Sequence, residues 1–206
     1  MIETPALRAA GICFSYDRVD VLHDVSADLV PGALTAIVGA NGSGKSTLVE
    51  IMAGVRAPRE GRVERTGEVA LVVQRARIPE TLPMTAREAV AMGTWARRRP
   101  RREVRRIVDD ALERVGLAEF ARRSIHALSG GQRQRVLIAQ GIARDAPILL
   151  LDEPAAGLDV ASRARTRAIL ADEADRGRAV GWVTHDEEDV ACAHRTVRLE
   201  AGRRVA

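Results

Sequence analysis

The sequence predicts a single α/β domain, residues 1–206, with a mostly parallel sheet. Buried strands are predicted at 34–38, 147–151 and 179–184, where short apolar runs are typical of strands covered on both faces. From residue 142 onward, strands and helical segments alternate, as connections between parallel strands require. We expect a core made of residues 1–76 and 142–206, with residues 77–141 inserted as a helical subdomain.

The strand at 34–38 leads into a glycine-rich loop. Residues 39–46 fit the pattern GxxxxGK[ST], and an apolar helical segment follows and ends at Gly54. In this order, backbone N–H groups and a positive helix end form a cradle for phosphate. Lys45, the only lysine among 32 basic residues, would reach the β and γ phosphates, and the Ser46 hydroxyl would ligate magnesium. The predicted nucleotide contacts are Gly39, Ala40, Asn41, Gly42, Ser43, Gly44, Lys45, Ser46 and Thr47.

Helical periodicity dominates the middle of the chain. Residues 85–92 carry an Ala and Val face, and residues 101–115 place their apolar side chains on one stripe before Gly116. The stripe consists of Val104, Ile107, Val108, Ala111, Leu112 and Val115. These segments therefore predict the helices of the inserted subdomain.

A second glycine-rich segment, Leu128-Ser-Gly-Gly-Gln132, precedes another helical segment. Ser129 is predicted to cap that helix, and the two glycines leave N–H groups exposed at its positive end. The candidate phosphate ligands are Ser129, Gly130, Gly131 and Gln132. One nucleotide needs both glycine-rich segments only where two copies of the chain meet head to tail. Each copy would then lend this helix end to the nucleotide held by the other's Lys45 loop.

Two carboxylates follow the strand at 147–151. Asp152 and Glu153 lie at its carboxyl end, where ligands bind to open parallel sheets. Neighbouring residues of a strand point in different directions, so these two side chains can have different roles. Asp152 is predicted to hold magnesium, and Glu153 to polarise the water that attacks the γ phosphate.

Together, and in this order, the motifs resemble the ATP-binding subunit of ABC transporters over nearly the whole chain. The resemblance implies a RecA-like P-loop core, an N-terminal antiparallel β subdomain and an α-helical subdomain that carries the signature segment 128–132. It also implies individual roles for four further positions. These are Tyr16 as the aromatic that stacks on adenine, Gln74 as a ligand of magnesium or of the attacking water, Asp159 in a dimer-contact loop beside the nucleotide, and His185 as a hydrogen-bond partner of the γ phosphate. Taken alone, Tyr16 could also be an ordinary strand aromatic.

Composition is that of a globular protein, with 46% apolar and 29% charged residues. No apolar run approaches the roughly 20 residues of a membrane-spanning helix, and the first residues lack a secretory pattern. Cys13 and Cys192 are too few for a disulfide framework, which indicates a reducing compartment. We therefore expect the chain in the cytoplasm, and the resemblance implies that it lies at the cytoplasmic face of the cell membrane, attached through a permease.

An arginine run at 97–102, continued by Arg105 and Arg106, is the strongest charge feature. It could contact anionic lipid headgroups or an acidic partner. We favour a solvated loop and helix face, balanced by acidic residues one turn on. The run has no aromatic residues to stack on bases, and the net charge is only +4, so no nucleic-acid partner is expected.

The segment 79–93 and the following Trp95 resemble bacterial zinc and manganese importers, and the actinobacterial zinc type most closely. This resemblance implies ATP and magnesium as cofactors, and a second copy of the chain as partner. It also implies a separate transmembrane permease and an extracytoplasmic metal-binding protein. The alternative is a cytosolic ABC-type ATPase that acts on a macromolecule in translation, cluster assembly or DNA maintenance.

Overall fold

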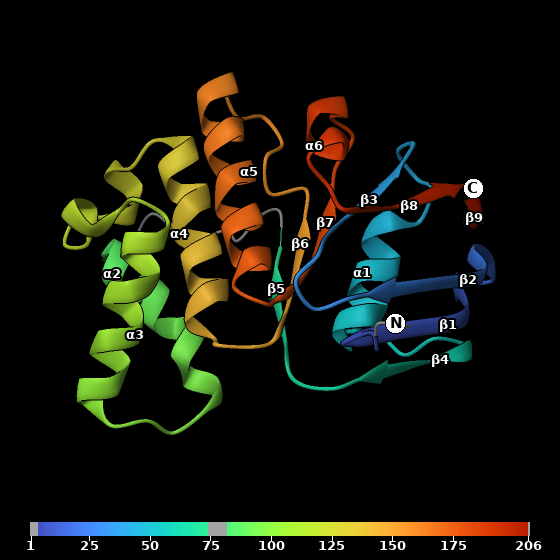
Figure 1. Ribbon diagram of the computed structural model, residues 1–206, viewed down its shortest axis with the longest axis horizontal. Coiled ribbons are helices and arrows are strands. Elements are labelled where there is room, and N and C mark those ends of the chain that lie inside the picture. The colour runs from blue at the N-terminus through green and yellow to red at the C-terminus, as the bar shows by residue number, and fades with distance from the viewer. Residues whose placement is uncertain (1–3, 74–81, 206) are drawn as a thin grey trace.

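The computed structural model describes residues 4–73 and 82–205. In this part of the chain the strands form two sheets, one of three strands and one of six (Figure 1). Gln74, with the rest of 74–81, lies outside the described residues, so its predicted role stays a prediction.

The small sheet is antiparallel and has the order β2-β1-β4. Its strands are β1 (Leu7–Tyr16), β2 (Val19–Leu29) and β4 (Glu60–Arg65). The β1–β2 connection is tight, because Tyr16 pairs directly with Val19 and the two residues between them both have positive φ. The antiparallel β subdomain implied by the resemblance is therefore confirmed.

The large sheet is parallel in all but its last pair. In spatial order its strands are β5 (Val69–Val72), β6 (Ile148–Asp152), β7 (Ala179–Val183), β3 (Leu34–Gly39), β8 (Arg195–Glu200) and β9 (Arg203–Val205). Among these pairs, only β8 and β9 run antiparallel. The carboxyl ends of β3, β6 and β7 thus lie at one edge, where predicted site residues follow all three strands.

Successive residues of β6 alternate between two hydrophobic clusters. Ile148 and Leu150 pack with α1 (Lys45–Ala53) and the small sheet, whereas Leu149 and Leu151 pack with α4 (Gly130–Ala143) and α5 (Val160–Asp175). Strand side chains alternate between faces, so the large sheet is covered on both sides. Figure 1 accordingly shows α1 and α4 on opposite sides of β6. The predicted α/β fold is confirmed.

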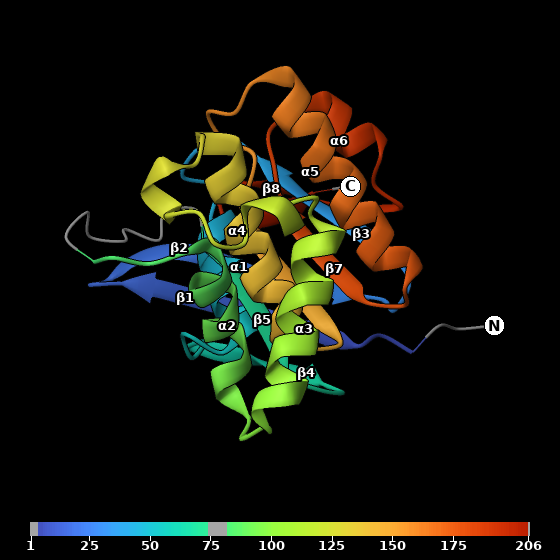
Figure 2. The ribbon, with the colours of Figure 1, turned by 90° about the vertical axis from the view of Figure 1, so that its left-hand side faces the viewer.

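The inserted region is helical, as expected. Its elements are α2 (Ala86–Ala91), η1 (Met92–Ala96), α3 (Arg101–Arg114), η2 (Ala118–Phe120), η3 (Ile125–Ala127) and then α4. Thr85 and Glu88 form a capping box at the start of α2. The predicted stripe of α3 faces the core, with Val108, Ala111 and Leu112 buried. Figure 2 shows α2 and α3 side by side, in front of α4.

Within residues 4–73 and 82–205, every helix is too short or too polar to cross a membrane.

Candidate functional site

The phosphate loop joins β3 to α1, as predicted. Gly44 caps α1 with φ 97°, and a Cβ there would lie 2.6 Å from Cδ2 of Leu22, so the position accommodates only glycine. Leu22 pairs with Phe14 in the β1–β2 hairpin. The hairpin that ends in Tyr16 is therefore packed against the start of α1.

Lys45 is buried at the base of this loop, with 5% of its surface exposed. Its Nζ donates hydrogen bonds to the carbonyl oxygens of Gly39 and Ala40, both at 2.9 Å. The Ser43 Oγ is buried and has no hydrogen-bond partner among the described residues. A buried hydroxyl without a partner and a buried ammonium beside exposed loop backbone both fit a phosphate group, which can accept from several donors at once.

Two of the three predicted magnesium ligands, Ser46 and Asp152, meet in the folded chain. The Ser46 hydroxyl donates to Oδ1 of Asp152 at 3.1 Å, although the two residues are 106 positions apart. Burial is the main cause that raises the pKa of Asp152, and the charge of Glu153 adds to it, whereas the Ser46 hydrogen bond and Lys45 oppose it. Neighbouring hydroxyl and carboxylate oxygens are ligands that suit magnesium.

Glu153 follows the last residue of β6 in a left-handed conformation, with φ 44°. Such a backbone is uncommon outside glycine and turns the chain sharply away from the sheet. Glu153 and His185 line the same small cavity of about 40 Å³ at the carboxyl ends of β6 and β7. The structure thus brings together the two residues predicted to act at the γ phosphate.

Tyr16 lies at the end of β1 with 38% of its surface exposed. Its ring makes an edge contact with Phe14, with ring centroids 4.9 Å apart, and the Arg56 guanidinium lies 4.8 Å from its centroid. A purine that stacks on Tyr16 would need the other ring face or would have to displace Arg56.

The signature segment caps α4 as predicted. The Ser129 Oγ accepts from the Gln132 N–H at 3.2 Å, and the Ser129 N–H donates to the Gln132 side chain at 2.9 Å. Gly130 is open on its outer side, whereas Gly131 lies against Ser162 at the start of α5. Since α4 and α1 cover opposite faces of the large sheet, one copy does not bring the signature segment and the phosphate loop together (Figure 1).

Asp159 caps α5. Its carboxylate accepts from both the backbone N–H and the hydroxyl of Ser162, each at 2.8 Å. The backbone hydrogen bond is the main cause that lowers the pKa of Asp159. Its carboxylate is therefore occupied within its own copy, and its predicted nucleotide contact stays a prediction.

Sequence reasoning missed a buried polar pair that flanks His185 in the chain. Thr184 and Asp189 are buried polar residues on either side of it, and they hydrogen-bond each other. The signal in the sequence was a hydroxyl residue directly before the histidine and an acid four positions after it.

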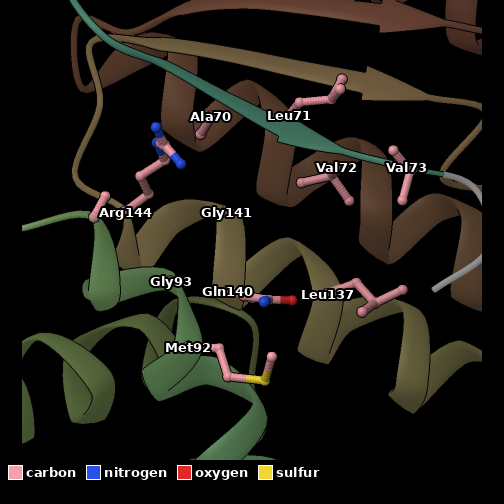
Figure 3. Close-up of a pocket in the computed structure, with 11 residues that line it drawn as sticks. Ala70, Leu71, Val72, Val73, Met92, Gly93, Leu137, Gln140, Gly141 and Arg144 are labelled. Atoms are coloured by element: carbon pink, nitrogen blue, oxygen red, sulfur yellow. The ribbon is translucent and has the colours of Figure 1, made fainter. Parts of the chain in front are cut away.

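A separate pocket of about 280 Å³ lies where the helical region meets the edge strand β5 (Figure 3). Leu71 and Val73 line it from β5 and its end, Met92 from η1, and Leu137 and Arg144 from α4 and its cap. Among the described residues, none of the predicted site residues lines it, and its lining comes from the junction of the two regions.

Residues 22–156 match the profile of the family described as "ABC transporter", which covers more than half of the chain. The chain belongs to the ABC transporter family. As an ATP-binding domain of this family, it hydrolyses ATP to power transport.

Several curated relatives of this ABC domain are named as ATP-binding proteins of import or transport systems. A manganese transport system ATP-binding protein of Listeria innocua is 37% identical over 88% of this chain and 80% of its own length. A zinc import ATP-binding protein of Cereibacter sphaeroides is 37% identical over 91% of this chain and 79% of its own length. Others are named for the import of sulfate or thiosulfate, thiamine and aliphatic sulfonates, so the relatives do not agree on a cargo.

Solved ABC structures share the fold. An inward-facing transporter described as of the metal-chelate type superposes with a TM-score of 0.90 at 30% identity, covering 98% of this chain and 82% of the other. A dimeric bacterial ABC transporter cassette gives 0.85 at 26% identity and covers 97% of both chains.

Proposed function

We propose that this chain is the MgATP-hydrolysing subunit of a metal-ion importer at the cytoplasmic face of the cell membrane, with zinc as the first candidate cargo and manganese as the second. The hydrogen bond between Ser46 and Asp152 carries the hydrolytic part, because it joins the phosphate loop to the carboxylate strand. The manganese and zinc relatives and the metal-chelate type structure support the cargo class. The cargo ion would be bound by the permease and an extracytoplasmic protein.

Each residue at the sheet edge has a distinct role in this proposal. Lys45 and the loop N–H groups hold the β and γ phosphates, and Ser46 and Asp152 hold magnesium, with Gln74 as a further ligand. Bound magnesium neutralises charge that develops on the phosphate oxygens. Glu153 accepts the proton of the attacking water, and His185 hydrogen-bonds the γ phosphate. Tyr16 stacks on adenine.

Two copies of the chain complete each site. Because α1 and α4 lie on opposite faces of the large sheet, the signature segment of one copy can reach a nucleotide only on another copy (Figure 1). A head-to-tail pair places Ser129–Gln132 of one copy opposite the Lys45 loop of its partner. A solved cassette that is described as dimeric supports the pairing of two copies.

The permease would dock in a groove between α2 and α3. Its volume is about 500 Å³, and its lining residues are Arg87, Ala91, Arg99, Arg101, Val104, Arg105, Val108 and Arg122. The three apolar residues form its apolar part, and five arginines surround them. This combination suits a short amphipathic segment with an apolar face and acidic flanks.

Among the described residues, internal carboxylates balance only part of this charge. Arg87 and Arg105 share Asp109, and Arg99 pairs with Glu103 and Asp145. Arg101 and Arg122 also line the groove, and both are exposed. Some arginines of the run are therefore paired with acidic residues, as the favoured interpretation of a balanced face requires. The remaining positive charge favours an acidic cytoplasmic segment of the permease as the partner.

The hydrolytic role is tested with purified protein. We expect magnesium-dependent ATP hydrolysis that rises more than linearly with protein concentration, and loss of ATP binding in Lys45→Ala. In lipid with the copurified permease, a zinc-loaded binding protein should stimulate turnover. Stimulation by an organic solute instead would overturn the metal proposal, and stimulation by RNA or DNA would overturn transport.

The docking groove is tested by charge reversal. Arg101→Glu with Arg122→Glu should abolish copurification of the permease while ATP hydrolysis by the isolated chain is unchanged. Arg198→Glu with Arg203→Glu, at exposed positions of β8 and β9, is the control and should leave copurification intact. Equal copurification of both double variants, or binding to anionic vesicles alone, would contradict a permease in this groove.

A further inference from the structure

We infer that Thr184, Asp189 and Arg167 form a positioning network that fixes His185 and ties it to α5. The inference rests on the proposed role of His185 at the γ phosphate. It assigns to these three residues a role that acts through His185.

The Thr184 hydroxyl bridges the two sides of His185. Thr184 directly precedes His185 and is 5% exposed, whereas His185 itself is exposed. Oγ1 of Thr184 donates a hydrogen bond to Oδ2 of Asp189 at 2.6 Å. The same oxygen accepts a hydrogen bond from the backbone N–H of Asp186 at 3.2 Å. One buried oxygen thus fixes the backbone before and after His185, which leaves the imidazole few directions in which to point.

Asp189 is the anchor of this bridge. It lies on α6 (Glu187–Ala191) and is 1% exposed. A carboxylate so deeply buried needs several donors, and the Arg167 guanidinium supplies a second one to Oδ1 at 3.1 Å. Arg167 also pairs with Glu188 at 2.7 Å. Removal of the Thr184 hydroxyl would therefore free the loop on both sides of the histidine.

A second arginine of α5 holds the same loop. Arg163, one turn before Arg167, donates to Asp186 at 3.0 Å. Both arginines project from the helix that Asp159 caps. A shift of the α5 start when two copies close would therefore be passed through these two ion pairs to the backbone around His185. The network makes the position of His185 depend on the segment predicted to contact the second copy.

The test uses a pair of matched variants in the full chain. Thr184→Val keeps the shape but removes the hydroxyl, and Thr184→Ser keeps the hydroxyl. We expect Thr184→Val to lower kcat on the order of tenfold to a hundredfold with little change in KM for ATP, because the histidine is misplaced and not removed. Thr184→Ser should restore most of the lost kcat.

To distinguish positioning of His185 from a purely structural role of Thr184, each Thr184 substitution is combined with His185→Ala. If Thr184 acts through His185, Thr184→Val should cause no further loss in the His185→Ala background. An equal loss in both backgrounds, or full activity of Thr184→Val, would overturn the inference. Arg163→Gln, whose partner is less buried, provides a second variant should Thr184→Val fold poorly. It should show the same loss and the same dependence on His185.

The outcome for His185→Ala alone tests the proposed role. Normal turnover by that variant would remove His185 from the reaction, and the positioning network with it. Slow turnover by His185→Ala beside normal turnover by Thr184→Val and Arg163→Gln would leave the role of His185 intact and reject the network alone.

Discussion

The Ser162 hydroxyl lies directly against Gly131, so that a Cβ at position 131 would be 2.3 Å from Oγ of Ser162. Gly131 belongs to the first turn of α4, and Ser162 to the first turn of α5. The signature segment therefore contacts, within one copy, the first turn of α5, the helix that Asp159 caps. The signature segment and Asp159 are both predicted to face the second copy, and this contact joins the two helix starts that carry them.

Gly131→Ala should separate the two helix starts. We expect a loss of about 1–3 kcal/mol in the free energy of unfolding, measured with urea, because the new methyl group overlaps the Ser162 side chain. Gly130→Ala is the matched control, since nothing lies within 4 Å of its added Cβ, and it should be neutral or slightly stabilising. In a Ser162→Gly background, which lacks that side chain, Gly131→Ala should cost much less; an equal cost in both backgrounds would show that the contact is not its cause.

Glu153→Gln should trap an ATP-dependent dimer. The amide keeps the shape of the side chain but cannot accept the proton of the attacking water, so turnover should fall by at least about 100-fold. Size-exclusion chromatography with ATP should show the dimer, and Glu200→Gln, an exposed acid elsewhere, should behave as the unchanged chain does. Wild-type turnover by Glu153→Gln would remove Glu153 from its proposed role.

Ser129→Arg should prevent closure without preventing nucleotide binding. The larger side chain occupies the start of α4, where the partner's nucleotide would lie, while the Lys45 loop of the same copy is untouched. ATP binding by fluorescence titration should persist, and hydrolysis and dimer formation should be lost. Normal hydrolysis in this variant would contradict the shared-site arrangement.

Asp152→Asn should stabilise the nucleotide-free chain while it abolishes magnesium-dependent hydrolysis. Burial raises the folded-state pKa of Asp152, so the unfolded chain releases this proton at lower pH than the folded chain does. The folded state of the unchanged chain therefore loses stability as pH rises from about 4, the ordinary pKa of an aspartate, through the raised value.

The pH dependence of the melting temperature tests whether the buried charge of Asp152 causes this loss of stability. The gain in melting temperature of Asp152→Asn should be full above the raised pKa and should shrink as pH falls toward the ordinary aspartate pKa, because both chains are then neutral at this position. Asp172→Asn, at an exposed position, should show no such trend. A gain that is constant across this pH range would exclude the burial of charge as its cause.

The sequence predicted those parts of the site that are encoded locally. The phosphate loop, the strand that presents Asp152 and the cap at Ser129 each depend on residues within a few positions of one another, so pattern and capping rules suffice. Contacts between distant segments were not predictable in this way. Two such contacts, the Arg56 guanidinium on Tyr16 and Ser162 against Gly131, follow from how separate elements pack. The helix at 101–115 and its apolar stripe were also predictable, because the periodicity of apolar residues depends only on the sequence of that helix.

Lys45 is buried, and its ammonium donates to two carbonyl oxygens of its own loop. Lys45 is the only lysine in the chain, and all other residues of the Lys and Arg class are arginines. An amine-selective acylating reagent therefore finds one side-chain target, and its rate of labelling, followed by mass spectrometry, becomes a direct gauge of how often that loop opens.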